Sequence, residues 1–458
     1  MAAHRKAIQR LRTAGFRLSF VILLIATLFA CCTFSSASGK KLTVLYTFNG
    51  GQDDGDNPWA NPTLAPNGVL YGTTQFGGNL NCEAGLGLGC GEIWQLVPPA
   101  RRHGAWSYSE IYEFTGGNDG YWPTTGLTLD TSGNLYGVTG GINGGGGASL
   151  FELVAPGQQG EAWTYQDIYD FGDEIAPNTP LLMDNSGALY GIGGVNSNNY
   201  NAVVQFVPTK SGPWTQNVLY QFSGGADGAG PSAIVMDSSG MIYGIAASGG
   251  TYGAGDVFQL APGQGGTWAF SVLYSFTGSP DSYPFALAQD ASGNLYGLAA
   301  NSSSSSSSSE VFQLALQNGA WTNNVLYVFS WNQFCGYPPA TLTAAPNGTV
   351  YGTTGWDWDF YGGSLFEVAP PAGQGPWTFN VQWDFNKQGP EWIPNGVVVA
   401  PSGLLYGTIE GDYSDGDVFQ FTPGKSKNQG KGKRYCFDEF DKSFVRKILA
   451  GPERRLLP

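Results

Sequence analysis

The stretch Gly293-Asn294-Leu295-Tyr296-Gly297 contains the pattern on which the fold of this chain depends. The pattern is a Tyr-Gly pair that follows an aliphatic residue, with another glycine three positions before the tyrosine. It occurs seven times, at Tyr71, Tyr136, Tyr190, Tyr243, Tyr296, Tyr351 and Tyr406. Successive tyrosines are 65, 54, 53, 53, 55 and 55 residues apart, a recurrence that predicts a repeat architecture.

Each repeat contains four segments that are typical of short β-strands bounded by turns. Strand A follows a proline and has small residues, as in Gly126–Leu129, and strand B holds the Tyr-Gly pair. Strand C reads aliphatic, aromatic, Gln or Glu, apolar, as in Leu150–Leu153. Strand D, as in Trp163–Phe171, has a Trp, an aromatic residue six positions later and a Phe two after that. This even spacing predicts that the three rings share one face of strand D, within the core.

The turn between strands A and B has its own signature. In the repeat that reads Asp290-Ala291-Ser292-Gly293-Asn294, the glycine predicts a left-handed backbone conformation. We expect the aspartate to accept hydrogen bonds from the backbone of the turn, as in three other repeats with Asp130, Asp184 and Asp237. Four short strands in about 54 residues correspond to one blade of a β-propeller.

The two ends of the repeat region predict how the ring closes. A complete strand D pattern occurs only six times, and a partial seventh copy, Leu42–Phe48, begins the repeat region. Lys40 stands where this copy would have its Trp. We therefore predict an all-β fold, a single seven-bladed β-propeller over residues 42–423 with four-stranded blades. The N-terminal strand would complete the last blade, whose other three strands come from residues 394–421, and this 3+1 arrangement removes an open sheet edge.

Charge is sparse and unevenly distributed. Charged residues make up 12% of the chain, and residues 42–423 hold four Lys/Arg against 31 Asp/Glu, a balance of −27. A nucleic-acid-binding surface needs basic residues to neutralise phosphates, so nucleic acid is excluded as a partner and anionic polymers are disfavoured. Neutral carbohydrate, cations and basic surface proteins remain compatible with this charge.

The first 41 residues are typical of a signal peptide or an N-terminal anchor. Five basic residues precede the apolar run Leu18–Ala30, whose 13 residues are short for a membrane span. Small residues at Ser35–Ser38 suit signal peptidase, whereas Leu28–Cys31 resembles a lipobox that would leave a lipidated Cys31; an uncleaved anchor is the third alternative. We expect a secreted or cell-envelope protein, a monomer that contacts membrane only through this segment, with a basic, disordered tail at residues 424–458.

Few residues could support catalysis or metal binding. The histidines are His4 and His103, which argues against a Ser-His-Asp triad and against a histidine-ligated metal. Cys82 and Cys90 lie in one glycine-rich loop, and we expect a disulfide between them. The segment Asp53–Asn57 has a calcium-like composition without the spacing of a known calcium loop, so calcium is the one cofactor left open.

In a propeller, the D–A loops between blades and the B–C loops within blades lie on the same rim. In this chain those loops gather aromatic and acidic residues that the repeat does not require. Rings can stack on a sugar face while carboxylates accept hydroxyl protons, which is the chemistry of neutral sugar binding. The alternative is that these side chains pack the loops and keep the surface soluble. The candidate ligand-binding residues are Trp59, Asp119, Trp122, Trp356, Asp357, Trp358 and Trp392.

The repeat unit D-x-x-G-N-L-Y-G … G-x-V-F-x-L-x-P … W-T-x-x-V-L-Y-x-F resembles the bacterial tandem repeat called GloVer, found in exported choice-of-anchor proteins. Residues Asp237–Phe276 form an almost complete copy, and the resemblance covers about residues 42–423. It implies an exported bacterial surface or secreted protein and implies no reaction. The tail departs from the family because it has no sorting motif or terminal hydrophobic helix.

These observations favour a non-catalytic binding or surface-interaction protein that recognises neutral glycans, or another surface protein, through one rim. The alternative is a glycan-active hydrolase or lyase that uses a carboxylate pair. Propeller enzymes usually place distinctive polar residues around the central channel, whereas the A strands here consist mainly of Ala, Leu, Val and Thr. This difference leads us to favour binding over catalysis.

Overall fold

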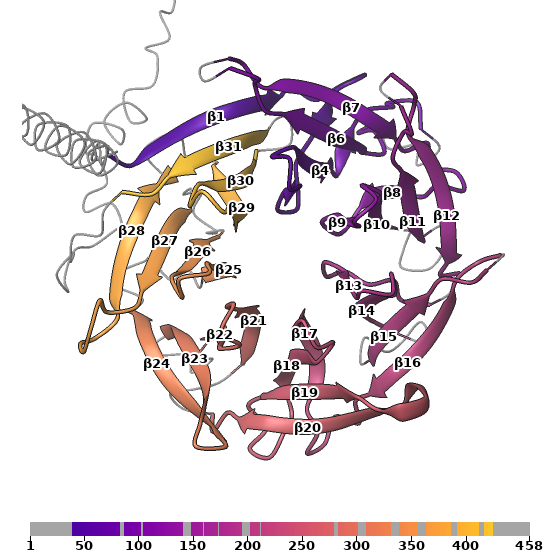
Figure 1. The fold of residues 1–458 in the computed structure, drawn as a ribbon. Helices are drawn as coiled ribbons and strands as arrows, with labels where there is room; N and C mark the ends of the chain where they lie inside the picture. Colours follow the sequence, from indigo (N-terminus) through magenta and orange to yellow (C-terminus); the bar gives the residue numbers. More distant parts are fainter. Residues whose placement is uncertain are drawn as a thin grey trace, which may run out of the picture.

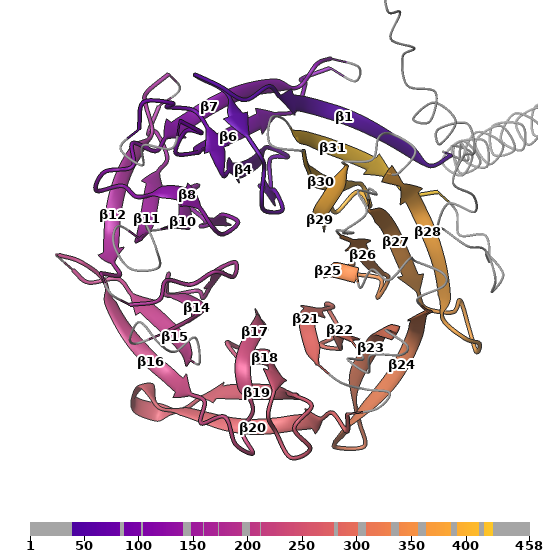
Figure 2. The same ribbon diagram turned by 180° about the vertical axis from the view of Figure 1, so that it is seen from behind.

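The computed structural model describes residues 39–82, 87–101, 104–140, 148–158, 160–172, 174–194, 202–210, 212–278, 283–300, 308–330, 339–355, 363–385, 392–411 and 416–424. These residues form seven antiparallel sheets arranged as blades around a central axis (Figure 1). Figure 2 shows the same ring from behind. Helical structure in the described residues is limited to 3-10 conformation at Gln264–Gly266 and at Phe385. None of the described residues belongs to a helix long and apolar enough to cross a lipid bilayer.

The first four blades follow one another along the chain, each running from strand A near the axis to strand D at the periphery (Figure 1). Blade 1 contains β3 (Thr63–Leu64), β4 (Leu70–Thr74), β6 (Glu92–Val97) and β7 (Ser107–Glu113). Blade 2 contains β8 (Tyr121–Pro123) and β9 (Thr128–Leu129), which together form its strand A, then β10 (Leu135–Gly140), β11 (Ser149–Val154) and β12 (Thr164–Asp170). Blade 3 contains β13 (Leu182–Met183), β14 (Leu189–Gly193), β15 (Ala202–Val207) and β16 (Thr215–Gln221). Blade 4 contains β17 (Ala229–Met236), β18 (Ile242–Ser248), β19 (Asp256–Pro262) and β20 (Trp268–Ser275).

The remaining three blades complete the ring. Blade 5 contains β21 (Pro284–Gln289), β22 (Leu295–Ala300), β23 (Ser308–Gln317) and β24 (Ala320–Ser330). Blade 6 contains β25 (Pro339–Ala344), β26 (Val350–Thr354), β27 (Ser364–Ala369) and β28 (Thr378–Asp384). Blade 7 contains β29 (Ile393–Val399), β30 (Leu405–Glu410), β31 (Gly416–Thr422) and, as its outermost strand, β1 (Lys41–Phe48). A two-stranded sheet of β2 (Gly55–Asp56) and β5 (Phe76–Gly77) lies in the loops of blade 1.

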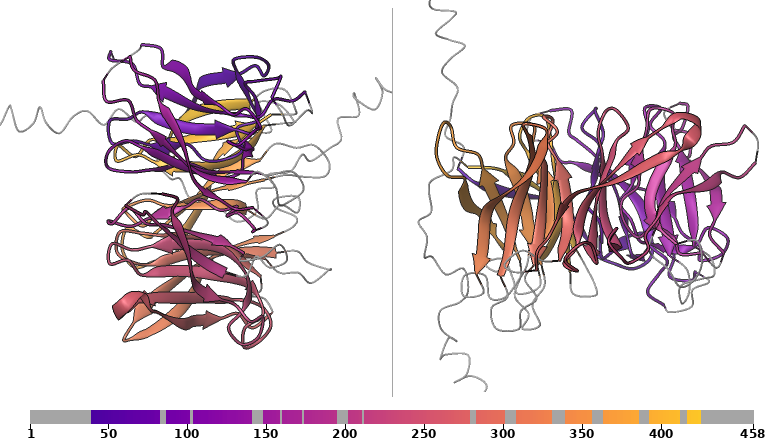
Figure 3. Two further views of the ribbon diagram at one scale, coloured as in Figure 1. Left: turned by 90° about the vertical axis from the view of Figure 1, so that its right-hand side faces the viewer. Right: turned by 90° about the horizontal axis from the view of Figure 1, so that it is seen from below.

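The strands run between two rims of the ring, which is seen from the side in Figure 3. Hydrogen bonds join the D–A loops to the B–C loops: the backbone N–H of Trp122 donates to the carbonyl of Cys90 at 2.8 Å, and that of Phe114 donates to Gly91 at 3.1 Å. We call this side the D–A rim. The A–B turns and C–D loops form the opposite side, the C–D rim.

The glycine of the Tyr-Gly pair leaves room for an aromatic ring on strand C. A methyl group on Gly297 would lie 2.1 Å from Cζ of Phe312, closer than atoms can approach. The same conflict, with a ring within 2.5 Å, exists at Gly72, Gly137, Gly244, Gly352 and Gly407. In blade 3, strand C has Val204 instead of a ring, and the nearest atoms to a methyl on Gly191 are 3.0 Å away. The glycine therefore permits tight packing within a blade.

The expected structure of the A–B turn is confirmed. Gly293 has φ of +84°, and the equivalent glycines of the other six repeats are also left-handed. Asp290 Oδ1 accepts hydrogen bonds from the backbone N–H groups of Ser292 at 2.9 Å and Asn294 at 3.0 Å. Its Oδ2 accepts from the Tyr296 hydroxyl at 2.9 Å, which joins the turn to the Tyr-Gly pair. The repeated aspartates are thus turn-stabilising residues.

The prediction that the Trp, aromatic and Phe side chains of strand D share one face is wrong. Pairing between β11 and β12 shifts at a bulge, because Leu150 pairs with Tyr169 and Phe151 with Asp167, so Ile168 is an extra residue. A bulge reverses the alternation of side chains along a strand. Trp163 therefore packs on Tyr71 of the preceding blade at 5.9 Å, whereas Phe171 contacts Phe206 of the following blade at 5.7 Å. A comparable shift occurs between strands C and D in every blade.

Strand β1 pairs with β31 from Lys41–Thr422 to Phe48–Gly416, so the outermost strand of blade 7 comes from the N-terminal end of the described chain. Across the junction with blade 1, Tyr46 stacks on Tyr108 with ring centroids 3.9 Å apart and planes 4° from parallel. Lys40 takes the place of the repeated Trp, and its ammonium donates to the carbonyl of Val381 at 2.6 Å. Sheet pairing and ring contacts together join the two ends of the propeller.

Candidate functional site

The most exposed aromatic side chains of the described chain lie on the D–A rim, at two separate parts of the ring. Among the described residues, three aromatic side chains stand out as largely exposed: Trp59 at 50%, Tyr252 at 63% and Tyr283 at 42%. Trp59 and Tyr283 belong to D–A loops, and Tyr252 belongs to the B–C loop of blade 4. Every other described ring is more buried, so this rim holds the aromatic surface that a partner could contact.

Trp59 projects from a backbone that is held on both sides. The carbonyl of Pro58 accepts a hydrogen bond from the Asn395 side-chain amide, and the carbonyl of Ala60 accepts one from the Thr408 hydroxyl at 2.9 Å. Asn395 and Thr408 lie on β29 and β30, so blade 7 fixes the loop that leads into blade 1. The half-exposed indole is therefore presented from a rigid segment, which lowers the entropy lost on binding.

Tyr283 has an unusual backbone conformation that recurs in the D–A loops. Its φ is +53°, although Tyr283 is not a glycine. The following residue, Pro284, restricts its backbone further. Its N–H donates to the Ala254 carbonyl at 2.9 Å and its carbonyl accepts from Ala300 at 3.2 Å. Left-handed φ values also occur directly before the proline at Asn57, Trp122 and Gly230. A strain of this kind costs on the order of 1 kcal/mol for a non-glycine residue and is often associated with functional sites.

Trp122, a predicted site residue, is only partly exposed and supports the neighbouring loop. Its indole N–H donates to the carbonyl of Gly89 at 3.1 Å, and its ring packs edge-on against Phe76 at 5.5 Å. The disulfide between Cys82 and Cys90 closes this loop. Trp122 therefore joins the D–A loop to the B–C loop of blade 1, with part of its ring facing solvent on the rim.

Asp119, another predicted site residue, is 6% exposed and closes its own loop. Its carboxylate accepts hydrogen bonds from the Tyr112 hydroxyl at 2.9 Å and from the backbone N–H and hydroxyl of Thr115 at 2.8 and 2.6 Å. Asp227 makes the same set of bonds with Tyr220 and Ser223, where the hydrogen bonds outweigh burial and lower the pKa of the carboxyl. Asp119 thus has a clear role in ordering the rim.

The remaining predicted site residues divide into two groups. Trp392 is partly buried, packs with the core of blade 7, and accepts a hydrogen bond at its carbonyl from Gly363 at 3.2 Å. Trp356, Asp357 and Trp358 lie outside the described residues. Tyr252 was not predicted; the signal that could have found it is a tyrosine without a repeat role in the glycine-rich segment Gly249–Gly255.

Two carboxyl groups with strongly raised pKa values lie near the junction of blades 7 and 1. Glu92 is fully buried, and burial raises the pKa of its carboxyl to about 8 despite a hydrogen bond donated by the Tyr108 hydroxyl, with Glu110, Asp54 and Glu113 adding to the rise. Burial and the charge of Glu113 raise the pKa of Glu110 to about 7. Protonated carboxyls near neutral pH are candidates for proton transfer.

Metal-binding potential was expected, if anywhere, at Asp53–Asn57. Asp54 accepts hydrogen bonds from the Tyr46 hydroxyl at 3.0 Å and from the backbone N–H of Asn49 at 3.0 Å. Across the described ranges, no group of three or more His, Cys, Asp or Glu residues is arranged to hold a metal ion. The local contacts of Asp54 thus assign it a role in the D–A turn.

Solved structures with a similar arrangement of strands are distant in sequence. The β-propeller domain of Cps50 (Swd1) from Myceliophteria thermophila is 11% identical with a TM-score of 0.48, covering 83% of this chain and 99% of that chain. The β-propeller domain of the trilobed protease from Pyrococcus furiosus is 9% identical with a TM-score of 0.43, covering 88% and 97%. An α-L-arabinanase from Penicillium chrysogenum, complexed with arabinobiose, is 12% identical with a TM-score of 0.39, covering 65% and 92%. These likenesses carry no information on ligand or activity.

Comparison with curated proteins returns no match. The profile of the family described as Gloeobacter/Verrucomicrobia repeat matches residues 30–244 and again residues 230–456. These two matches confirm the resemblance to the GloVer repeat and extend over most of the chain. By its sequence and its seven repeated blades, this chain belongs to the Gloeobacter/Verrucomicrobia repeat family.

Proposed function

We propose that this protein is an exported, non-catalytic binding protein that recognises neutral glycans through the D–A rim. The observation that carries the proposal is that the largely exposed rings of the described chain lie on one rim, Trp59 at the junction of blades 7 and 1 and Tyr252 and Tyr283 in blades 4 and 5, with the backbones of Trp59 and Tyr283 held by neighbouring blades. Rings held in this way can stack on sugar faces without the cost of ordering a flexible loop.

The charge of the propeller supports a neutral ligand. Residues 42–423 have a balance of −27, so polyanions such as nucleic acids or acidic polysaccharides are repelled. A neutral glycan avoids this repulsion, and its hydroxyls can donate to rim carboxylates. In this proposal the protein is a monomer in the cell envelope or outside the cell, with membrane contact limited to the N-terminal segment or a lipidated Cys31.

The second candidate function is glycan hydrolysis or cleavage by a carboxylate pair, which the raised pKa values of Glu92 and Glu110 bring into consideration. Glu92 is fully buried and cannot reach a polymer. Glu110 and Glu113 share a hydrogen bond, whereas glycosidases hold their two carboxyls about 5 to 9.5 Å apart around the sugar bond. These contacts favour binding.

The test is a neutral-glycan array probed with the exported chain, with and without calcium. We expect Trp59→Ala and Tyr252→Ala each to weaken binding to the best ligand about tenfold or more. Tyr283→Gly removes the ring while keeping the left-handed backbone, and it should weaken binding without loss of stability. Leu316→Ala, which truncates a 60% exposed apolar side chain on the C–D rim, is the control and should bind normally.

Three results would overturn this proposal. Failure to bind any neutral glycan removes the ligand class, and full binding by all three aromatic variants removes the rim. Release of oligosaccharide products, abolished by a single carboxylate substitution, would establish the enzyme instead. Export is checked separately by fractionation of the native host and mass spectrometry of the N-terminus, which also distinguishes cleavage near Ser35–Ser38 from lipidation of Cys31.

A further inference from the structure

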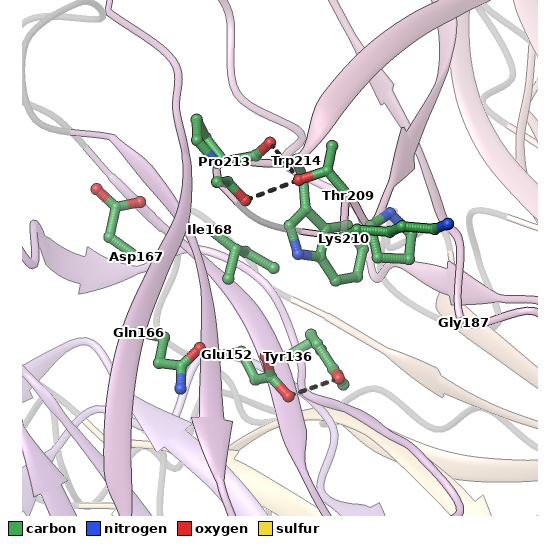
Figure 4. A pocket seen from close by; sticks show the side chains of 12 residues that line it. Tyr136, Glu152, Gln166, Asp167, Ile168, Gly187, Thr209, Lys210, Pro213 and Trp214 are labelled. Atoms are coloured by element: carbon green, nitrogen blue, oxygen red, sulfur yellow. Dashed lines mark hydrogen bonds between the residues drawn. The ribbon is translucent and has the colours of Figure 1, made fainter.

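A pocket of about 560 Å³ lies between blades 2 and 3 on the C–D rim (Figure 4). Glu152 lines this pocket and accepts hydrogen bonds from the Tyr136 hydroxyl at 2.8 Å and from the Asn134 side-chain amide at 3.0 Å. On the blade 3 side, the Thr209 hydroxyl donates to the carbonyl of Gly212 at 2.9 Å. The fold itself therefore accounts for these polar groups, which is not true of a carboxylate in blade 4.

Asp256, the first residue of β19, lies fully buried just below the D–A rim. Neither of its carboxylate oxygens has a hydrogen-bond partner among the described residues. Burial raises the pKa of its carboxyl, an effect that the side chain of Ser275 on β20 partly offsets and the charge of Asp227 increases. An ionised carboxylate without partners is costly to bury, so Asp256 has to be neutralised by a proton or by a cation.

The fold does not require an acid at this first position of strand C. Three blades have neutral residues there, Ser149, Ala202 and Ser364, and three others have acids that are not without partners, Glu92, Glu310 and Asp417. The Tyr108 hydroxyl donates to Glu92, whereas Phe270 stands where blade 1 has this tyrosine, so Asp256 lacks the equivalent donor. Blade 4 therefore keeps a buried acid that the repeat does not need.

Two glycine-rich loops enclose the Asp256 carboxylate. A methyl group on Gly250 would lie 2.3 Å from Oδ2 and 2.4 Å from Oδ1, so the B–C loop needs a glycine here. The place that a methyl group on Gly228 would take lies 3.4 Å from Oδ2 and 3.5 Å from the carbonyl oxygen of Ser248. The N–H of Gly250 donates to the carbonyl of Gly225 at 2.9 Å, which joins the B–C loop to the D–A loop. A carboxylate and a backbone carbonyl thus approach the same point between two loops that are already joined.

We propose that Asp256 is the central ligand of a calcium site between these two loops, on the D–A rim of blade 4. Carboxylate and carbonyl oxygens are the donors that calcium prefers, and calcium tolerates irregular geometry and completes its shell with water. The Ser248 carbonyl supplies a second oxygen. Asp227, whose carboxylate accepts from the Tyr220 hydroxyl at 3.0 Å, adds negative charge from the D–A loop. The site therefore needs no third carboxylate.

The position of the site has a consequence for the B–C loop. Gly250, which lies against the carboxylate, is itself only partly buried, so an ion has a short path from solvent to Asp256. The same loop carries the exposed ring of Tyr252, and bound calcium would fix the segment that holds it. The inference does not rest on glycan recognition, because its test measures the ion alone.

Isothermal titration of the full chain with CaCl₂, after treatment with EDTA, tests the inference. We expect saturable binding with a dissociation constant of about 0.1 to 1 mM, the range of extracellular calcium modules. Magnesium should bind about tenfold more weakly or not at all, because it demands octahedral geometry and gives up its water reluctantly. Asp256→Ser gives blade 4 the residue of blades 2 and 6, so it should fold normally and lose about tenfold or more in calcium affinity. Asp256→Asn, which keeps the shape of the side chain, should have the same effect.

The matched control is Asp417→Ser, which makes the same change in blade 7, where the Thr47 hydroxyl bonds the carboxylate, and it should bind calcium as the unaltered chain does. Terbium, which occupies calcium sites, gives a second readout: its tyrosine-sensitised emission should fall when CaCl₂ is added and be weaker in both Asp256 variants. Lack of binding at about 10 mM CaCl₂, tenfold above the expected range, would overturn the proposal. So would unchanged affinity in the Asp256 variants, or equal affinity for magnesium. Circular dichroism monitors folding of each variant, and the comparison of calcium with magnesium needs no substitution.

Discussion

Among the glycines of the Tyr-Gly pairs, Gly297 has the least room for a side chain, because a methyl group there would lie 2.1 Å from Cζ of Phe312. We expect Gly297→Ala to reduce the free energy of unfolding by about 1 to 3 kcal/mol, as overpacking forces the ring or the strand to move. The measurement is urea-induced unfolding. Gly191→Ala is the matched control in blade 3, where valine replaces the ring, and it should cost less.

A second substitution tests whether the Phe312 ring causes this loss of stability. Phe312→Val gives blade 5 the Gly-Val combination of blade 3, at the cost of a cavity. In that background Gly297→Ala should cost little, so the two substitutions should couple favourably. Additive losses would show that the conflict between methyl and ring is not the reason for the glycine.

Glu92 makes the stability of the ring junction depend on pH. Its carboxyl has an ordinary pKa of 4.5 in the unfolded chain and a pKa of about 8 in the folded protein, chiefly because it is buried. Between these values the folded state holds a proton that the unfolded state has lost. Its contribution to stability is therefore fully present below pH 4.5 and is lost as the pH rises toward 8.

The test is the free energy of unfolding from pH 5 to pH 8 for the unaltered chain and for Glu92→Gln. Glutamine keeps an acceptor for the Tyr108 hydroxyl and cannot ionise. The variant should show a shallower fall in stability, by up to about 1.4 kcal/mol per pH unit. A residual fall is expected because burial also raises the pKa of Glu110, to about 7. Identical slopes would mean that Glu92 ionises normally in the folded protein.

At the level of strands and loops, the sequence predicts local structure well and distant contacts poorly. The A–B turn could be predicted because its glycine and aspartate act within five residues. The bulge in strand D could not, since the extra residue, such as Ile168 or Leu273, is an ordinary strand former without a glycine or proline to mark it. Its consequence is that the rings of strand D contact both neighbouring blades.

The candidate site shows the same limit. Trp59 can be proposed from the sequence because the repeat gives it no role, but the rigidity of its loop depends on Asn395, 337 residues from Pro58. Asp119 looked equally promising, yet its bonds to Tyr112 and Thr115 become visible only when the loop is folded. The exposure of a side chain and the support of its backbone depend on the assembled propeller, so the spacing of residues along the chain does not predict them.

The A–B turns of different blades use different side chains to bond the same backbone N–H group. Asp290→Ala should lower the stability by about 1 to 2 kcal/mol, because the N–H groups of Ser292 and Asn294 lose their acceptor. Blade 6 has alanine at this position and uses Asn347, two residues later, to bond the N–H of Thr349 at 3.0 Å. Adding Ser292→Asn should therefore restore part of the loss in thermal unfolding. No recovery would indicate that the aspartate acts mainly through Tyr296.

For the whole molecule, the pairing of β1 with β31 determines whether the ring has an open edge. A chain that begins at Asn49 lacks β1, which leaves the outer edge of β31 unpaired, and we expect it to form dimers or aggregates. The measurement is light scattering during size-exclusion chromatography, with a chain that begins at Gly39 as reference. A chain that ends at Gly424 is the control, since it retains every strand of the described residues, and it should stay monomeric. A monomeric, equally stable chain without β1 would contradict this role.

The contact that closes blade 7 also imposes an order on folding. The Thr47 hydroxyl donates to Asp417, a residue 370 positions later, and both lie in strands that pair along their length. At a synthesis rate of about 5 to 20 residues per second, the first strand would wait roughly 20 to 70 s for its partner. Blades 1 to 6 have all their strands close together in the sequence and can form during that time. Completion of blade 7 is then the slow, non-local step, so the newly made chain spends most of its synthesis as an open arc with β1 unpaired.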